Sequence, residues 1–203
     1  MAAAPRTGHG GTGHDGAVTR LGLTGHLLLA TPKLREPAFH RAVILLLDHG
    51  DEGAMGVVLN RPMRVQVGAV LPDWQAHATA PGVLFHGGPV GLDSALGLVA
   101  VPGDEPEPAG VRRFSGALGL VDLDAPPLSV VPALCGLRVF AGYAGWSSGQ
   151  LEAEVADGAW YVVEGEPRDP FSAEPTALWP QVLRRQRSDL AYVATYPDDP
   201  TQN

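Results

Sequence analysis

The sequence contains one cysteine, Cys135, among 203 residues, so an internal disulfide is excluded. We expect a cytoplasmic protein, because thiols stay reduced in that compartment. Long apolar runs are also missing, since the longest covers only residues 42–47, whereas a bilayer-spanning helix needs ~20 residues. Residues 1–16 contain no apolar core of a secretory signal. The sequence therefore predicts a chain without a membrane segment.

Positive charge is scarce, because 14 Lys and Arg residues stand against 22 Asp and Glu residues, which gives a formal net charge of −8. Nucleic-acid affinity depends largely on Lys and Arg, so this balance argues against direct DNA binding. The one dense basic cluster consists of Arg184, Arg185 and Arg187. We interpret it as the solvent-exposed last turn of a helix, where cations complement the helix dipole.

The size and apolar content of the chain suit one domain. Apolar residues make up 45% of the sequence, which is enough for a single hydrophobic core. Residues 1–19 are rich in Gly, Ala, Thr and His and show no periodicity, so we predict a disordered tail there. The domain should then cover residues 20–197, followed by a short C-terminal tail at 198–203.

Short apolar runs bounded by Gly, Pro and Asn predict strands, and segments with helical spacing predict helices. We expect strands at residues 27–30, 42–47, 55–59, 83–86, 96–101, 117–121, 137–142 and 160–163. We expect helices at residues 65–74, 129–134, 150–156 and 176–187. The continuous apolar run 42–47 should be buried on both faces, and the polar residues 48–53 should form a hairpin loop after it. Strands dominate, a pattern that favours an α+β fold with a mostly antiparallel, curled sheet and a few covering helices.

Residues 145–149 read Gly-Trp-Ser-Ser-Gly, which matches the G-x-S-x-G pattern of a serine nucleophile elbow. Ser147 holds the nucleophile position, between a strand-like and a helix-like segment. In that elbow a histidine follows the serine, but all seven histidines here precede Ser147. Ser147 and Gln150 also fit a capping box at a helix N-terminus. Two interpretations stay open, a helix cap, which we favour, and a serine hydrolase.

Two other groups of reactive side chains have simpler interpretations. Cys135 lies in an apolar segment without a neighbouring cation, so we predict a buried structural thiol. The polar loop containing Asp48, His49, Asp51 and Glu52 could attract a cation, but its spacing does not match an EF-hand. We therefore predict neither a metal nor a cofactor.

Two short turns each follow a predicted strand. One is Asn60-Arg61-Pro62, and the other is Gly87-Gly88-Pro89. Successive glycines can present backbone N–H groups to an anion, and Arg61 could add a fixed charge. Alternatively, the glycines only supply the backbone conformation of a tight turn. Both interpretations stay open from the sequence.

Several segments, in a fixed order, carry a more specific signal than any single motif. They are residues 25–32 (GHLLLATP), 37–43 (PAFHRAV), His49, 53–62 (GAMGVVLNRP), 87–90 (GGPV), 142–146 (GYAGW), 149–152 (GQLE) and Trp160. Together they resemble the AlgH/YqgE family of bacterial proteins. The resemblance implies an α+β fold with a coiled, barrel-like sheet and the family's label of transcriptional regulator. It implies no established activity, so no catalytic residue carries over.

We therefore predict a non-catalytic, cytoplasmic protein that binds a protein or small-molecule partner in a regulatory role. A serine hydrolase that uses Ser147 is the alternative. Binding residues are expected at strand ends, where functional loops gather. The candidates are Asn60, Arg61, Gly87, Gly88, Tyr143, Trp146, Gln150 and Glu152.

Overall fold

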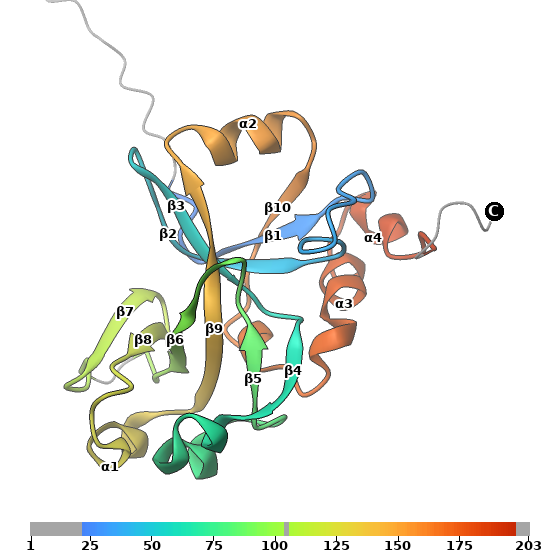
Figure 1. The fold of residues 1–203 in the computed structure, drawn as a ribbon. Coiled ribbons are helices and arrows are strands. Elements are labelled where there is room, and N and C mark those ends of the chain that lie inside the picture. The colour runs from blue at the N-terminus through green and yellow to red at the C-terminus, as the bar shows by residue number, and fades with distance from the viewer. Residues whose placement is uncertain (1–21, 104–105, 198–203) are drawn as a thin grey trace, which may run out of the picture.

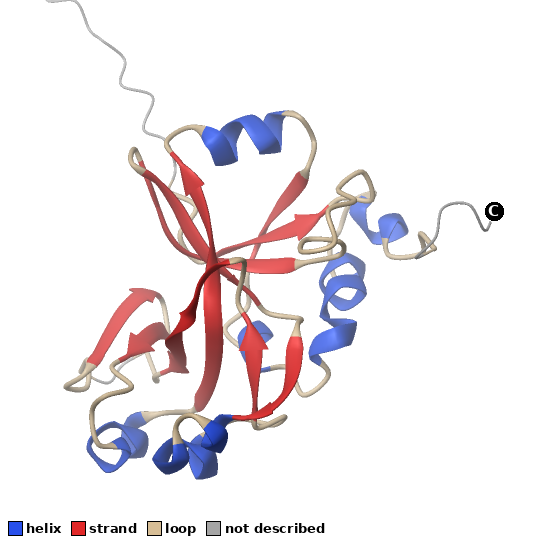
Figure 2. Cartoon of the chain, in the orientation of Figure 1, coloured by secondary structure: helices blue, strands red, loops and turns tan. Residues whose placement is uncertain are grey.

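The computed structural model describes residues 22–103 and 106–197. The predicted tails at 1–19 and 198–203 lie outside the described residues. One curled sheet of ten strands forms the centre of the molecule, and short helices cover it (Figures 1 and 2). This arrangement confirms the predicted α+β class with a mostly antiparallel, coiled sheet.

The sheet and its helices follow one another along the chain in many short elements. The strands are β1 His26–Ala30, β2 Val43–Gly50, β3 Gly53–Val58, β4 Pro62–Gln66, β5 Val83–His86, β6 Val90–Ala100, β7 Val111–Ser115, β8 Leu118–Val121, β9 Gly136–Ser147 and β10 Trp160–Glu164. The α-helices are α1 Pro127–Val130, α2 Gln150–Ala156, α3 Leu178–Arg184 and α4 Leu190–Val193. The 3-10 helices are η1 Val67–Ala69, η2 Pro72–His77, η3 Val131–Ala133, η4 Asp169–Phe171 and η5 Pro175–Ala177.

The long strand β9 joins two parts of the sheet. The strand order is β10-β1-β2-β3-β9-β6-β8-β7, with β5 paired in parallel to β9 and β4 paired to β5. The C-terminal part of β9 pairs with β3, from Ser147 opposite Gly53 to Ala144 opposite Gly56. Its N-terminal part pairs with β6 and β5. In Figure 1, β9 therefore runs from the α1 end of the molecule to the α2 end.

Both faces of the first part of β2, Val43 to Leu47, are buried, which confirms the prediction for residues 42–47. Alternate side chains of a strand point to opposite faces of the sheet. Leu45 joins a core cluster that includes Trp179 of α3. Its neighbour Ile44 joins a second cluster on the other face, with Leu151 of α2. A third cluster lies beneath η1 and η2, in the other half of the sheet.

Two local predictions in the first half of the chain were wrong. Residues 65 and 66, the start of the predicted helix 65–74, instead end strand β4, which pairs with β5. The helical turns begin only at Val67 and Pro72. Strand β2 continues to Gly50, so the hairpin turn contains two residues instead of the predicted loop 48–53.

Cys135 is exposed, which contradicts the predicted buried thiol. It lies in the turn just before β9, and its backbone N–H donates to the carbonyl of Ala100 at 2.7 Å. The apolar neighbours in sequence pack inward from β9, whereas the turn residue itself stays at the surface.

Arg185 differs from the other arginines of the basic cluster at the end of α3. Its two Nη atoms donate to the two carboxylate oxygens of Asp169 at 2.5 and 2.6 Å, and Asp169 is only 3% exposed. These hydrogen bonds raise the pKa of Arg185 above its ordinary value. Arg184 and Arg187 are exposed. The prediction of a solvated cluster is therefore wrong for Arg185 alone.

Candidate functional site

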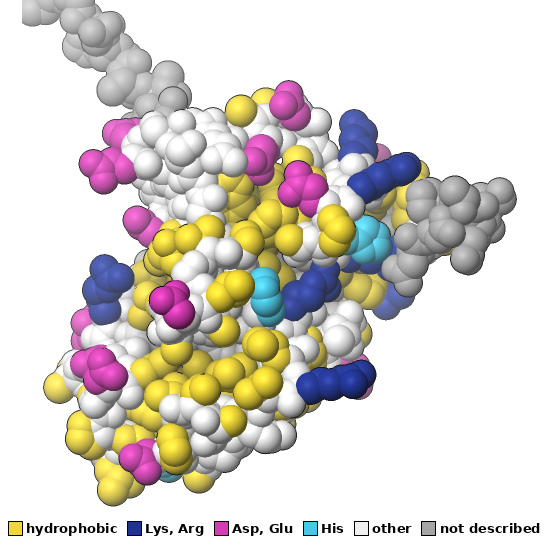
Figure 3. Space-filling view, in the orientation of Figure 1, with side chains coloured by type: hydrophobic (Ala, Val, Ile, Leu, Met, Phe, Trp, Pro, Cys, Tyr) yellow, Lys and Arg dark blue, Asp and Glu magenta, His cyan; other side chains and the backbone are white. Residues whose placement is uncertain are grey.

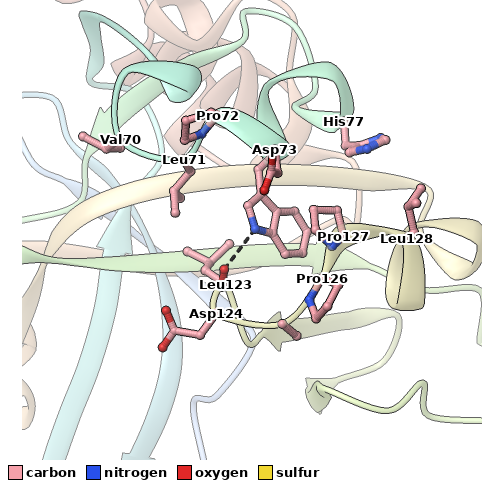
Figure 4. A pocket seen from close by; sticks show the side chains of 12 residues that line it. Val70, Leu71, Pro72, Asp73, His77, Leu123, Asp124, Pro126, Pro127 and Leu128 are labelled. Atoms are coloured by element: carbon pink, nitrogen blue, oxygen red, sulfur yellow. Dashed lines mark hydrogen bonds between the residues drawn. The ribbon is translucent and has the colours of Figure 1, made fainter.

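An apolar groove lies between η2 and the turn that follows β8 (Figure 4). Its volume is about 600 Å³, which is within the range of small-molecule sites. It is lined by Val70, Leu71, Pro72, Asp73, Trp74, His77, Leu123, Asp124, Ala125, Pro126, Pro127 and Leu128. Because most of these side chains are apolar, the groove suits an apolar ligand surface.

Trp74 joins the two walls of the groove. Its side chain is buried, and the indole Nε1 donates to the carbonyl of Leu123 at 3.0 Å, as the dashed line in Figure 4 shows. Pro72 on one wall and Pro126 and Pro127 on the other fix the backbone angle φ. A site that is held open in this way loses little conformational entropy when a ligand binds.

The rim of the groove combines exposed apolar side chains with negative charge. Val70 is 56% exposed and Leu128 is 80% exposed. Asp73 and Asp124 are exposed on opposite walls. Neither carboxylate forms an ion pair with a residue that the structure describes. The groove therefore has an apolar floor and two carboxylates that are open to a cation from outside the chain.

The binding residues predicted from the sequence lie elsewhere, in two groups. The first group is Asn60, Arg61, Gly87, Gly88 and Tyr143, and the second is Trp146, Gln150 and Glu152. In the first group the His86 N–H donates to the carbonyl of Arg61 at 2.9 Å, and the Val58 N–H donates to the carbonyl of Gly87 at 2.8 Å. Neither group lines the groove. The structure shows the contacts of these residues within the chain. Their binding of a partner stays a prediction.

Asn60 is a buried residue that holds a strained backbone. Its side chain accepts a hydrogen bond from the Val43 N–H at 3.0 Å and donates one to the carbonyl of Arg41 at 2.8 Å. Arg41 has a φ of 52°, the one positive φ outside glycine in the described residues. This left-handed conformation costs about 1–2 kcal/mol for a residue with a side chain. The two hydrogen bonds of Asn60 keep the segment in place despite that cost.

Gly87 and Gly88 allow the chain to approach β9 closely. The N–H of Gly87 donates to the carbonyl of Ala141 at 2.8 Å, so it is not available to an anion. A Cβ atom on Gly87 would lie 2.2 Å from the carbonyl oxygen of Gly142. A Cβ atom on Gly88 would lie 2.2 Å from the carbonyl carbon of Tyr143. These contacts favour the interpretation of the glycines as a tight, closely packed turn.

Ser147 is the last residue of β9 and is not the N-cap residue of a helix. Helix α2 begins at Gln150, and its N-cap residue is Gly149, which has a φ of 74° and no side-chain cap. The Gln150 Oε1 atom accepts from the Ser147 N–H at 3.0 Å, so only the reach-back half of the predicted capping box is present. The Ser147 hydroxyl donates to the same oxygen at 3.2 Å. Its partner is thus an amide rather than a histidine, and the hydrolase alternative gains no support.

Glu154, which the sequence analysis did not select, organises the second group. One carboxylate oxygen accepts from the indole N–H of Trp146 at 2.9 Å and from that of Trp160 at 2.8 Å. The other oxygen accepts from the Gln150 side chain at 3.0 Å. The two indole rings lie edge to face with their centres 6.1 Å apart. These contacts fasten α2 to β9 and β10. The spacing of Gln150 and Glu154, four residues apart on one helix face, was the available sequence signal.

We expect Glu154→Ala to lower the free energy of unfolding by about 1.5–3 kcal/mol, because it removes a charged acceptor from two shielded indole N–H groups. Urea denaturation followed by tryptophan fluorescence measures the change. The neighbouring exposed residue Ala153 offers the control Ala153→Ser, which should stay within about 0.5 kcal/mol of the original protein. Equal stability of the two variants would contradict this role of Glu154.

Glu152 lies beside His49 of the β2–β3 hairpin. The His49 Nδ1 atom accepts from the Leu23 N–H at 3.2 Å, which assigns the imidazole proton to Nε2. That Nε2 atom is 3.4 Å from the Glu152 carboxylate, longer than an ordinary hydrogen bond. Over residues 22–103 and 106–197, no three His, Cys, Asp or Glu side chains gather where they could hold a metal ion.

Comparison with known proteins decides the family. The AlgH-like family model matches residues 27–191. The chain belongs to the AlgH-like family. A UPF0301 protein of Streptomyces coelicolor is 62% identical over 184 residues, which cover 89% of this chain and 95% of that protein. A UPF0301 protein of Thermobifida fusca is 52% identical over 193 residues, which cover 91% and 97%. The resemblance inferred from the sequence is thus confirmed.

Two solved structures share the AlgH-like fold. A crystal structure of a Corynebacterium diphtheriae protein has a TM-score of 0.80 and 32% identity, and covers 84% of this chain and 91% of its own. The solution structure of AlgH from Pseudomonas aeruginosa has a TM-score of 0.64 and 29% identity, and covers 87% and 95%. In the described part of our AlgH-like chain, no helix is both long and apolar enough to cross a membrane. Family membership fixes the fold but assigns no reaction, so function has to be inferred from the surface.

Proposed function

We propose that this AlgH-like protein is a non-catalytic binding protein whose groove receives an apolar segment of a protein partner. The observation that carries the proposal is the preformed groove itself, with Val70 and Leu128 exposed at its rim and Trp74 joining its walls. Exposed apolar side chains beside a concave apolar surface are typical of protein interaction sites. Their burial against a partner would remove this surface from water.

The two carboxylates at the rim indicate which charge the partner segment should carry. Asp73 and Asp124 lie on opposite walls and form no ion pair with the described residues. A partner segment with Lys or Arg flanking an apolar stretch matches this pattern, because complementary charge guides encounter and fixes orientation. The net charge of −8 acts in the same direction.

A regulatory role in the cytoplasm fits this binding activity. The family label of transcriptional regulator is then explained through a protein partner rather than through DNA, because an acidic chain repels the phosphate backbone. The single cysteine is compatible with a reducing compartment.

The proposal is tested by photo-crosslinking in cells. We expect p-benzoylphenylalanine in place of Leu128 to give one or a few discrete crosslinked products, because this position is at the rim of the groove. The same amino acid in place of Leu92, which is 57% exposed on β6, serves as the control and should not give those products. A Val70→Glu substitution should remove them from the Leu128 probe. If both probes gave the same pattern, or if Val70→Glu had no effect, the groove would not be the binding surface.

A further inference from the structure

Arg61 carries a half-buried positive charge, and no carboxylate in the described part of the chain lies within ion-pair distance of it. One guanidinium nitrogen donates to the carbonyl of His40. Burial lowers the pKa of Arg61 below its ordinary value. Arg61 forms no ion pair with any residue that the structure describes. Removing a guanidinium from water costs free energy, which one backbone carbonyl does not fully offset.

Two other shielded arginines make more contacts within the chain than Arg61, although Arg138 forms no ion pair with the described residues and its buried Nε atom has no hydrogen-bond partner among them. Arg138 donates to backbone carbonyls at 2.8 and 3.1 Å, and its guanidinium lies 4.3 Å from the centre of the Phe85 ring. Arg185 binds a buried carboxylate through both Nη atoms. Within residues 22–103 and 106–197, Arg61 instead forms one hydrogen bond from its five guanidinium N–H groups. Its remaining N–H groups are available to a molecule from outside.

Two histidines border Arg61. His40 supplies the carbonyl that accepts its hydrogen bond. His86 lies opposite Arg61, because Pro62 pairs with Phe85 and the His86 N–H donates to the Arg61 carbonyl at 2.9 Å. Side chains of directly opposite residues lie on the same face of a sheet. Both histidines are partly exposed, and Figure 3 shows basic and histidine side chains together near the middle of one face of the molecule.

The backbone around Arg61 is held in an unusual conformation. Asn60 fixes the carbonyl of Arg41 and the N–H of Val43, and Arg41 keeps its φ of 52°. Strained residues of this kind concentrate at functional sites, where the surrounding structure holds them. The effect here is to fix the segment that contains His40 beside Arg61.

We propose that Arg61, His40 and His86 form a binding site for an oxyanion, the carboxylate or phosphate group of a small molecule. The planar guanidinium fork matches two oxygens of such a group, and the imidazole N–H groups add further donors. The bound anion supplies the counter-charge that no described residue provides at Arg61. The site lies outside the groove and is independent of the protein partner proposed above.

The test is a titration of the full, ¹⁵N-labelled chain with inorganic phosphate and, separately, with acetate, at a constant ionic strength set by chloride. We expect saturable changes in the amide signals of residues 40, 61 and 86 and in the Nε–H signal of Arg61. Saturation with phosphate alone would identify a phosphate site, and saturation with acetate alone would identify a carboxylate site. The absence of saturation with both anions would overturn the proposal.

Variants separate a specific site from general charge attraction. Arg61→Gln should weaken anion binding by about tenfold or more, because a charged donor is lost. Arg64→Gln is the matched control, an exposed arginine of strand β4 three residues after Arg61, and should change binding by less than twofold. Equal losses in the two variants would contradict the site. If Arg61→Gln does not fold, Arg61→Lys and His86→Gln replace it, and unchanged binding in both would reject the proposal.

Discussion

Replacing Arg185 with alanine is expected to lower the free energy of unfolding by about 3–5 kcal/mol, because it leaves a buried charge without its partner. The Asp169 carboxylate is 3% exposed and binds both Nη atoms of Arg185. Without Arg185, its one remaining close donor among the described residues is the Glu166 N–H at 2.7 Å. Urea denaturation followed by circular dichroism measures the loss.

Two further variants show whether the uncompensated charge is the cause. Arg184→Ala removes an exposed arginine one residue earlier and should cost less than about 0.5 kcal/mol. Adding Asp169→Asn to the Arg185→Ala protein should recover part of the lost stability, because a neutral amide is cheaper to bury than a carboxylate. A loss below about 1 kcal/mol in Arg185→Ala would show that the pair contributes as little as a surface ion pair.

Asn60→Ala should destabilise the protein by about 2–6 kcal/mol, because two buried backbone groups each lose a hydrogen-bond partner worth about 1–3 kcal/mol. The groups are the Val43 N–H and the carbonyl of Arg41. The strained φ of Arg41 would then lose its support. Thermal unfolding, monitored by circular dichroism, reports the change as a lower Tm.

The variant Asn60→Asp separates the two hydrogen bonds of Asn60. Aspartate still accepts from the Val43 N–H but, when ionised, has no proton to donate to the Arg41 carbonyl. We expect it to be destabilised as well, because a carboxylate would face a carbonyl oxygen in a buried position. Gln66→Ala, at an exposed position of β4, is the control. If Asn60→Ala had the same Tm as this control, the two hydrogen bonds of Asn60 beside Arg41 would not contribute to stability.

Local sequence signals predicted the exact first and last residues of some elements. Helix α2 covers residues 150–156 as expected, because Gly149 and the Asp157-Gly158 pair mark its two ends within the sequence. Strand β5 likewise covers residues 83–86. Strands β4 and β7 were missed, because each depends on a partner strand and neither shows a clean apolar alternation. Arg112 and Arg113 give the β7 segment the polar character of a surface loop. Its pairing with β8 is visible only in the structure.

The candidate sites were harder to predict than the fold, because their residues meet only in three dimensions. The groove joins η2 to the turn after β8, and the Trp74 hydrogen bond that holds it reaches Leu123, 49 positions further on. The sequence pointed to Arg61 and to Gly87-Gly88 for one shared reason, an anion site. The structure distinguishes the two, because the Gly87 N–H donates to β9, whereas the Arg61 guanidinium forms a single hydrogen bond with the described residues.

The double attachment of β9 restricts how the length of the chain can change in evolution. Its first part is held in register by β6 and β5, and its last part is held by β3. One residue inserted between them would turn every later side chain to the opposite face. Trp146 would leave the buried layer beneath α2, and the exposed Gly145 position would take its place. We therefore expect an insertion within β9 to disrupt the fold far more than an insertion in the connections between strands.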